Sequence, residues 1–78
     1  MDPKDLELIE ELAPRHPELA ALWREHLELE ARLERLAGRR YLTPQEELEV
    51  KRLKKIKLAG RDRIEAILAQ HRREQDGA

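Results

Sequence analysis

The chain has 78 residues, of which 42% are charged and 3% aromatic. This length allows one small domain, and the absence of cysteine excludes disulfides, thiolate zinc sites and cysteine nucleophiles. No apolar run reaches the ~20 residues of a membrane span, and Met1 to Glu11 lacks the apolar stretch of a signal peptide, so we expect a cytoplasmic protein that does not contact a membrane. The formal net charge of -1 argues against a polycation built for nucleic acid.

The composition predicts an all-α fold. Leu, Glu, Arg, Ala and Lys dominate, which is typical of long helices and coiled coils, and helical periodicity covers most of the chain. Asn, Cys, Ser and Phe are absent. The lack of Asn and Cys beside many Glu and Arg resembles the composition of heat-resistant proteins.

The first predicted element is a short helix over residues 3–13. Asp2 is suited to the N-cap and Pro3 to the first helical position. Pro14 and Pro17 interrupt the pattern, because each disfavours helix in the residue before it. A helix of this length is marginal by itself in water, so we expect it to form only if it packs on the rest of the chain.

The second predicted helix covers residues 17–37, and Gly38 is expected to end it in the left-handed conformation. Its apolar stripe follows the alternating three- and four-residue spacing of packed helices. Trp23 and Leu27 widen that stripe beyond a two-helix seam, which indicates more than one neighbour. The stripe consists of Leu19, Leu22, His26, Leu29, Leu33 and Leu36.

The third predicted helix covers residues 44–73 and has the clearest start in the chain. Thr43 and Glu46 match a capping box, with Pro44 at the first helical position. Residues 74–78 are expected to fray. The apolar stripe of this helix consists of Val50, Leu53, Ile56, Gly60, Ile64, Ile67 and Leu68.

The short connection over residues 38–42 predicts that the two long helices are antiparallel neighbours. A tight return places Leu29 opposite Leu53 and Leu19 opposite Ile64. The same register places Trp23 opposite Gly60. Because glycine inside a helix costs about 1 kcal/mol against alanine, we expect the indole to fill the space at Gly60. A tolerated glycine without a packing partner is the alternative.

The stretch from His16 to Leu68 resembles the small bacterial YdcH-like family, a coiled-coil-forming domain of unknown function. The matching segments are His16-Pro17, His26 with Leu29-Glu30 and Leu33, and Leu53-Lys54-Lys55 followed by Lys57-Leu58 and Arg61-Asp62 with Ile64. Gly60 replaces a usual apolar residue and Trp23 a usual phenylalanine-like one. The resemblance implies a helical hairpin and no established activity.

A polar group interrupts the predicted seam. His26 and Glu30 lie one turn apart, and the register brings Lys57 towards them from the other helix. We expect Glu30 to contact Lys57, or Lys54, in a buried or half-buried polar pair that fixes helix register. A catalytic site is one alternative, but the chain has no Ser or Cys nucleophile. A metal site is another, but His26 and Glu30 give at most two ligands per chain. We therefore expect no enzyme activity, metal, cofactor or small-molecule substrate.

Charge is unevenly distributed, with ten acids and five bases in residues 1–37 but seven acids and eleven bases in residues 38–78. Lys51, Arg52, Lys54 and Lys55 form a possible patch for an anionic partner. The alternative is that these bases only complement the acidic helix and solvate their own. No aromatic residue accompanies them, so nucleic acid is a less favoured partner.

A lone hairpin of this size is marginal without disulfides, metal or self-association. Leu48 and Leu58 also lie off the main stripe of the third helix. We therefore expect a homo-oligomer, preferably a dimer in which two hairpins form a helical bundle. The sequence favours a non-enzymatic protein–protein interaction or assembly module over an accessory protein that contacts nucleic acid or an acidic partner through residues 51–63.

Overall fold

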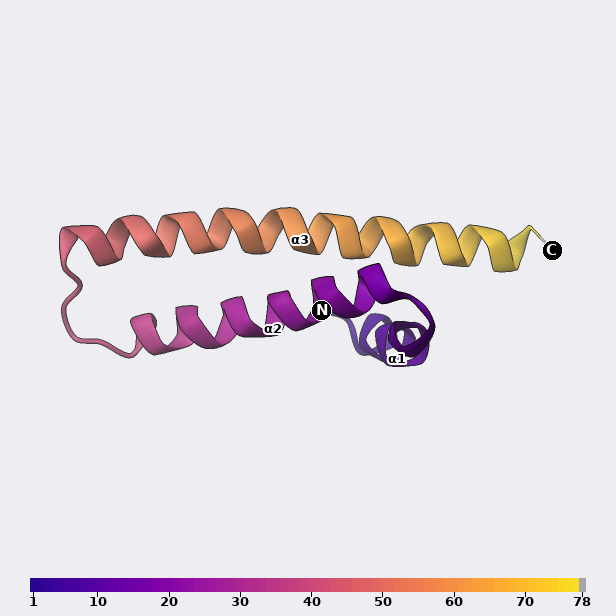
Figure 1. Ribbon diagram of the computed structural model, residues 1–78, viewed down its shortest axis with the longest axis horizontal. Helices are drawn as coiled ribbons and strands as arrows, with labels where there is room; N and C mark the ends of the chain where they lie inside the picture. Colours follow the sequence, from indigo (N-terminus) through magenta and orange to yellow (C-terminus); the bar gives the residue numbers. More distant parts are fainter. Residues whose placement is uncertain (78) are drawn as a thin grey trace.

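The protein is an antiparallel helical hairpin with a short helix across one end (Figure 1). The computed structural model describes residues 1–77, and these form α1 (Pro3–Leu12), a 3₁₀ turn (Ala13–Arg15), α2 (Pro17–Ala37) and α3 (Pro44–Asp76). Within this part of the chain there is no strand. The all-α hairpin predicted from the sequence is confirmed.

Each α-helix begins at a side chain that accepts a hydrogen bond from its first turn. The Asp2 carboxylate accepts from the Lys4 N–H at 2.8 Å. The Thr43 hydroxyl accepts from the Glu46 N–H at 3.1 Å, while the Glu46 carboxylate accepts from the Thr43 N–H at 3.0 Å. Both of these caps were predicted. The cap of α2 was not: Nδ1 of His16 accepts from the Leu19 N–H at 3.1 Å.

The helix ends differ from the sequence predictions in three places. Gly38 has φ −74° and ψ −10°, so the predicted left-handed cap is wrong. The chain leaves α2 by a right-handed turn, in which the N–H groups of Gly38 and Arg39 donate to carbonyls of the last helical turn. α1 ends at Leu12 because Pro14 belongs to a 3₁₀ turn. α3 continues past residue 73 to Asp76, so residues 74–76 of the expected frayed tail are helical, and Ala78 lies outside the described residues.

The first hydrophobic cluster lies where all three helices meet. Arg72 of α3 and Asp5 of α1 approach to 2.6 Å at its edge, which fastens α1 to the hairpin. Ile9, Leu19 and Ile64 are fully buried here. α1 is therefore packed on the hairpin, as a marginal helix requires. The cluster consists of Ile9, Leu12, Leu19, Ile64, Ile67 and Leu68, with Leu8, Leu22 and Trp23 packed against it.

The second hydrophobic cluster belongs to α2 and α3 alone. Leu29, Leu36 and Leu53 are its buried members, and Leu33, Leu42 and Val50 pack against them. Figure 1 shows that α1 does not reach this part of the hairpin, which leads to the loop between α2 and α3. We call this part, residues 29–58, the open half. Because a two-helix seam has no third helix over it, both of its sides face solvent.

Ion pairs across the seam agree with the packing register. Near the loop, Nη2 of Arg32 lies 2.7 Å from Glu49. At the other end of α2, Arg63 donates to Glu18 through both Nε and Nη2, at 3.0 and 2.8 Å. These pairs, like the leucine contacts, place α2 and α3 side by side along the whole of α2.

The predicted packing of Trp23 into the space at Gly60 is wrong. A methyl group added at Gly60 would meet no side chain within 4 Å. The Trp23 ring instead stacks on His26, with ring centroids 5.3 Å apart and planes inclined by 13°. The indole therefore packs on His26 of its own helix and against the three-helix cluster, and Gly60 adjoins open space.

Gly60→Ala should raise the free energy of unfolding by about 1 kcal/mol. Alanine restricts the unfolded backbone and suits a helix interior, and the structure offers room for its methyl group. Chemical denaturation measures the change, and Ala59→Gly is the matched control because exposed Ala59 is the neighbouring residue in α3. Ala59→Gly should lose a similar amount. A destabilised Gly60→Ala variant would show that the space at Gly60 is occupied.

The capping box makes stability depend on pH. The hydrogen bond from the Thr43 N–H is the main cause that lowers the pKa of Glu46 from its ordinary 4.5, and the nearby Arg39 adds to it. Since the folded-state pKa lies below the unfolded value, the ionised carboxylate stabilises the fold above pH 4.5. That contribution is lost as the pH falls through the folded-state pKa.

Glu46→Gln should therefore flatten the decline of the melting temperature below pH 4.5, because glutamine can fill the same position of a capping box without titrating. Thermal unfolding followed by circular dichroism between pH 7 and pH 3 measures the slope. Glu47→Gln is the matched control, since exposed Glu47 occupies the same first turn. An equal effect of the two substitutions would contradict a role specific to the cap.

Candidate interaction surface

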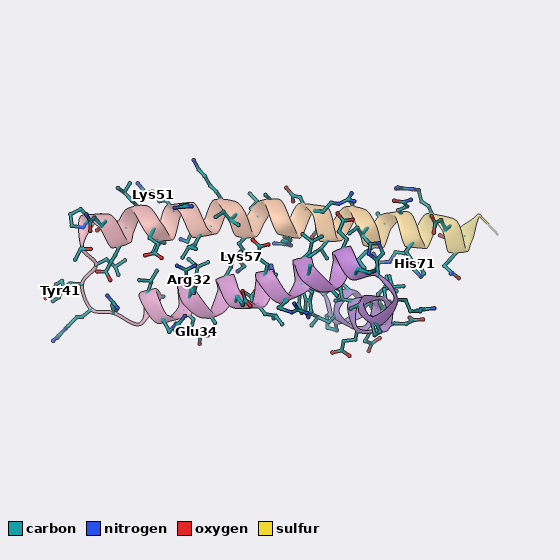
Figure 2. All side chains as sticks on the ribbon, in the orientation of Figure 1. Arg32, Glu34, Tyr41, Lys51, Lys57 and His71 are labelled. Carbon is teal, nitrogen blue, oxygen red and sulfur yellow. The ribbon has the colours of Figure 1, made fainter. Side chains whose placement is uncertain are left out.

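A polar layer separates the two hydrophobic clusters. Nε2 of His26 lies 3.1 Å from Oε1 of Glu30, and Nζ of Lys57 lies 3.4 Å from the same oxygen. Figure 2 shows Lys57 extending from α3 towards α2. The structure thus brings together the three residues that the sequence placed at this level of the seam.

The description of Glu30 and Lys57 as a buried pair needs correction. The Glu30 side chain is 47% exposed and that of Lys57 is 34% exposed. Both are long enough to extend from the seam to its edge, where their charged ends stay hydrated. Their attraction is accordingly that of a surface pair, about 0.2–1 kcal/mol.

His26 is the buried member of this layer, with 5% of its surface exposed. Its Nδ1 atom is buried without a hydrogen-bond partner among residues 1–77. A buried polar atom without a partner costs about 1–3 kcal/mol. No three His, Cys, Asp or Glu side chains of that segment gather closely enough to hold a metal ion. The layer interrupts the apolar seam at the point where the three-helix part meets the open half.

His26→Leu should raise the free energy of unfolding by about 1 kcal/mol. The substitution removes the unpartnered Nδ1 and joins the two hydrophobic clusters. The half-exposed Glu30 carboxylate loses its contact with His26 but still pairs with Lys57 and stays hydrated. Urea denaturation measures the change, with Glu30→Gln as a control that should alter stability by less than about 0.5 kcal/mol. A loss of about 1 kcal/mol or more in His26→Leu would mean that the imidazole contacts outweigh the cost of its burial.

Two grooves border the seam of α2 and α3, mainly along the open half; the first also reaches Ala21 on α2, and the second reaches Arg61 on α3. The first, which we call groove A, has a volume of about 810 Å³. Its apolar lining includes Leu48, 66% exposed, and Ile56, 37% exposed. Its charged lining is balanced, with three acids and three bases. The residues of groove A are Ala21, Arg24, Glu25, Glu28, Leu29, Arg32, Gln45, Leu48, Glu49, Arg52, Leu53 and Ile56.

The second groove, groove B, has a volume of about 730 Å³ and a different character. Its lining is mainly apolar and includes Leu58, which is 58% exposed. Three bases line it against one acid, Glu34. The residues of groove B are Leu33, Glu34, Ala37, Leu42, Val50, Lys54, Lys57, Leu58 and Arg61. The two grooves have no residue in common.

The predicted basic patch is divided between different surroundings. Lys51, Arg52, Lys54 and Lys55 are all exposed, and none has an ion-pair partner within 4 Å in the described chain. Arg52 lines groove A and Lys54 lines groove B. Figure 2 shows Lys51 projecting from the side of α3 that faces away from α2. At about 100° per residue these four bases occupy roughly 160° of the circumference of α3, on the side opposite Leu53, with Arg52 at one edge and Lys54 at the other.

Most of the predicted core and interface residues face the seam, with one exception. Leu19, His26, Leu29, Leu36, Leu53, Ile64 and Ile67 are buried, and Leu22, Trp23, Leu33, Val50 and Gly60 are partly buried. Ile56 is 37% exposed and belongs to neither hydrophobic cluster, so it is not a core residue of the single chain. It lines groove A together with residues of α2.

Sequence reasoning singled out Arg52 of groove A and Lys54 and Lys57 of groove B, but it missed the other charged residues of both grooves and the contributions of Ala37 and Leu42 to groove B. The signal available was the pair of leucines outside the main stripe, Leu48 and Leu58. The structure places each of them in a different groove. No helix within residues 1–77 combines the length and apolar character needed to cross a membrane.

Comparison with known proteins gives a family and no activity. Residues 19–68 match the family described as "Protein of unknown function (DUF465)". This match covers more than half of the chain and includes the whole seam of α2 and α3. No curated protein and no solved structure matches the chain.

Proposed function

The chain belongs to the DUF465 family of unknown function, also called YdcH-like, and we propose that it is a small non-enzymatic protein–protein interaction module. The observation that carries the proposal is the open half of the hairpin. There a two-helix seam has a groove on each side, and exposed leucines line both grooves. A cytoplasmic location and a homodimeric state are parts of the same proposal.

Groove A is the self-association surface in this proposal. A contact between two identical copies related by a two-fold axis places the same patch on both sides, so the patch must be complementary to itself. Groove A is compatible with this condition because its acids, including Glu25 and Glu28, are equal in number to its bases, so that no net charge repels a second copy. Leu48 and Ile56 supply the apolar area that each copy would bury against the other.

The small size of the protein supports self-association. In chains below about 70–80 residues a single apolar core rarely supplies more than about 3–5 kcal/mol of stability. Here the second cluster contains only three buried side chains, and no metal-binding group lies within residues 1–77. Burial of Leu48 in a dimer would contribute about 1.5–3 kcal/mol for each copy.

Binding of nucleic acid through residues 51–63 is the weaker alternative. Lys57, Arg61 and Arg63 lie close to Glu30, Glu65 and Glu18, respectively, which reduces the positive potential of this segment. The remaining bases occupy the outer half of α3, and no aromatic residue between positions 51 and 63 is available to stack on a nucleic-acid base. A single strand would therefore meet cations without a stacking platform.

Sedimentation velocity at micromolar concentrations tests the proposal. The unmodified chain should sediment as a dimer, and Leu48→Glu should raise the dissociation constant at least about tenfold, because each dimer loses two buried leucines. Leu27→Glu is the matched control, since Leu27 is 46% exposed but lines neither groove. A monomeric unmodified chain, or equal effects of the two substitutions, would refute self-association through groove A.

A further inference from the structure

We propose that groove B binds an acidic amphipathic helix of another protein. This inference rests on the proposed role as an interaction module but concerns a different surface from groove A. Three observations support it. The lining of groove B is mainly apolar, its charged residues are mostly basic, and an acidic amphipathic helix, α1, already packs on the other half of the same hairpin.

Groove B is long enough to hold a short helix. Its α3 side is a continuous stripe in which the apolar Val50 and Leu58 alternate with the basic Lys54 and Arg61, at intervals of three or four residues. At 1.5 Å per residue this stripe is about 16 Å long, or three helical turns. Leu33 of α2 and Leu42 of the loop line the opposite side. A partner helix with apolar residues at positions i, i+3, i+4 and i+7 fits such a groove.

The charges of groove B favour an acidic occupant. Lys54 has no ion-pair partner in the described chain, and the pairs of Lys57 with Glu30 and of Arg61 with Glu65 are both solvent-exposed. Exposed pairs are weak, so carboxylates of a partner can exchange for them. The excess of bases over the single acid Glu34 also disfavours a second copy of the same groove, since like charges would face each other.

The chain contains an example of the occupant that we propose. α1 is an acidic amphipathic helix, and its Leu8, Ile9 and Leu12 pack on the hairpin. Its Asp5 lies 2.6 Å from Arg72 on α3, so an acid on the docked helix meets a base on the long one. Groove B offers the same combination of apolar floor and α3 bases in the half that α1 leaves open.

The test uses the full chain and synthetic peptides. The probe is a 14-residue helical peptide with leucines at i, i+3, i+4 and i+7 and glutamates at its flanks; one control peptide has lysine in place of glutamate, and another has the probe's residues in scrambled order. Fluorescence anisotropy measures affinity, and amide chemical shifts locate the contact. We expect the glutamate peptide to bind at least about tenfold more tightly than either control. Its shifts should lie at Val50, Lys54 and Leu58.

Variants of the chain separate groove B from groove A. Leu58→Glu should weaken peptide binding at least about tenfold, whereas Leu48→Glu, an equally exposed position in groove A, should leave it unchanged. Lys54→Gln should weaken binding about threefold, and added salt should weaken it further. Circular dichroism of each variant verifies that the hairpin is folded.

Several results would overturn the inference. These are no binding at millimolar peptide, equal binding of the lysine or scrambled peptide, or chemical shifts confined to groove A. Tighter binding of a single-stranded oligonucleotide than of the acidic peptide would assign the bases to nucleic acid instead. Loss of self-association in Leu58→Glu would assign groove B to a second copy of the chain. Sedimentation of the unmodified chain and of Leu48→Glu tests self-association, and peptide binding tests groove B. A monomeric chain would therefore refute the dimer without deciding whether groove B binds the peptide.

Discussion

The position of α1 across one end of the hairpin is the constraint on which the rest of the structure depends. α1 crosses the hairpin instead of running along it (Figure 1), so it covers a length of about one helix diameter, roughly 10–12 Å, whereas the 21 residues of α2 extend for about 31 Å. α1 therefore adds a third layer to only part of the hairpin. The molecule measures 53 × 21 × 16 Å, and its shortest dimension is little more than the diameter of one helix. A protein of these proportions has a compact core at one end and an exposed seam at the other.

The polar layer at His26 lies at the boundary between the three-helix core and the two-helix seam. On one side, Leu19 and Ile64 are fully buried in the cluster that includes α1. On the other side, Leu29 and Leu53 are buried by contacts between α2 and α3 alone. A histidine in the seam sacrifices apolar contact, and Glu30 on the same helix lies between it and Lys57 of α3. A slip of α3 by one turn would bring Lys54 or Arg61 to the place of Lys57. The layer therefore allows a base of α3 to meet Glu30 at this level but does not by itself select one register.

The sequence was sufficient to predict the helices, their antiparallel pairing and their approximate register. These features depend on local signals, such as the capping box at Thr43, and on the apolar stripes, which can be recognised from the spacing of leucine and isoleucine in the sequence. The pairing of Trp23 with Gly60 failed for a physical reason. A helical wheel gives the direction of a side chain around its own axis, but not the distance between the axes at that level. The indole stacks on His26, one turn along α2, and the space at Gly60 is open.

The grooves lay beyond sequence reasoning because each is built from the flanks of two helices. Whether Ile56 is covered by α2 or borders a groove depends on a small rotation of α3, which changes little in the periodic pattern. The side-chain cap from His16 was also missed, since histidine is not among the residues usually favoured at an N-cap.

The contrast between the two grooves follows from how charge is divided along the chain. α2 is predominantly acidic and α3 is rich in bases, so any groove between them takes its charge from the residues that each helix turns towards it. On the side of groove A, α2 presents both acids and arginines, and the lining is balanced. On the side of groove B, α2 presents Leu33, Glu34 and Ala37, and the bases of α3 prevail. One hairpin can therefore offer a surface suited to its own copy and another suited to an acidic helix, and the two can be occupied together because they share no residue.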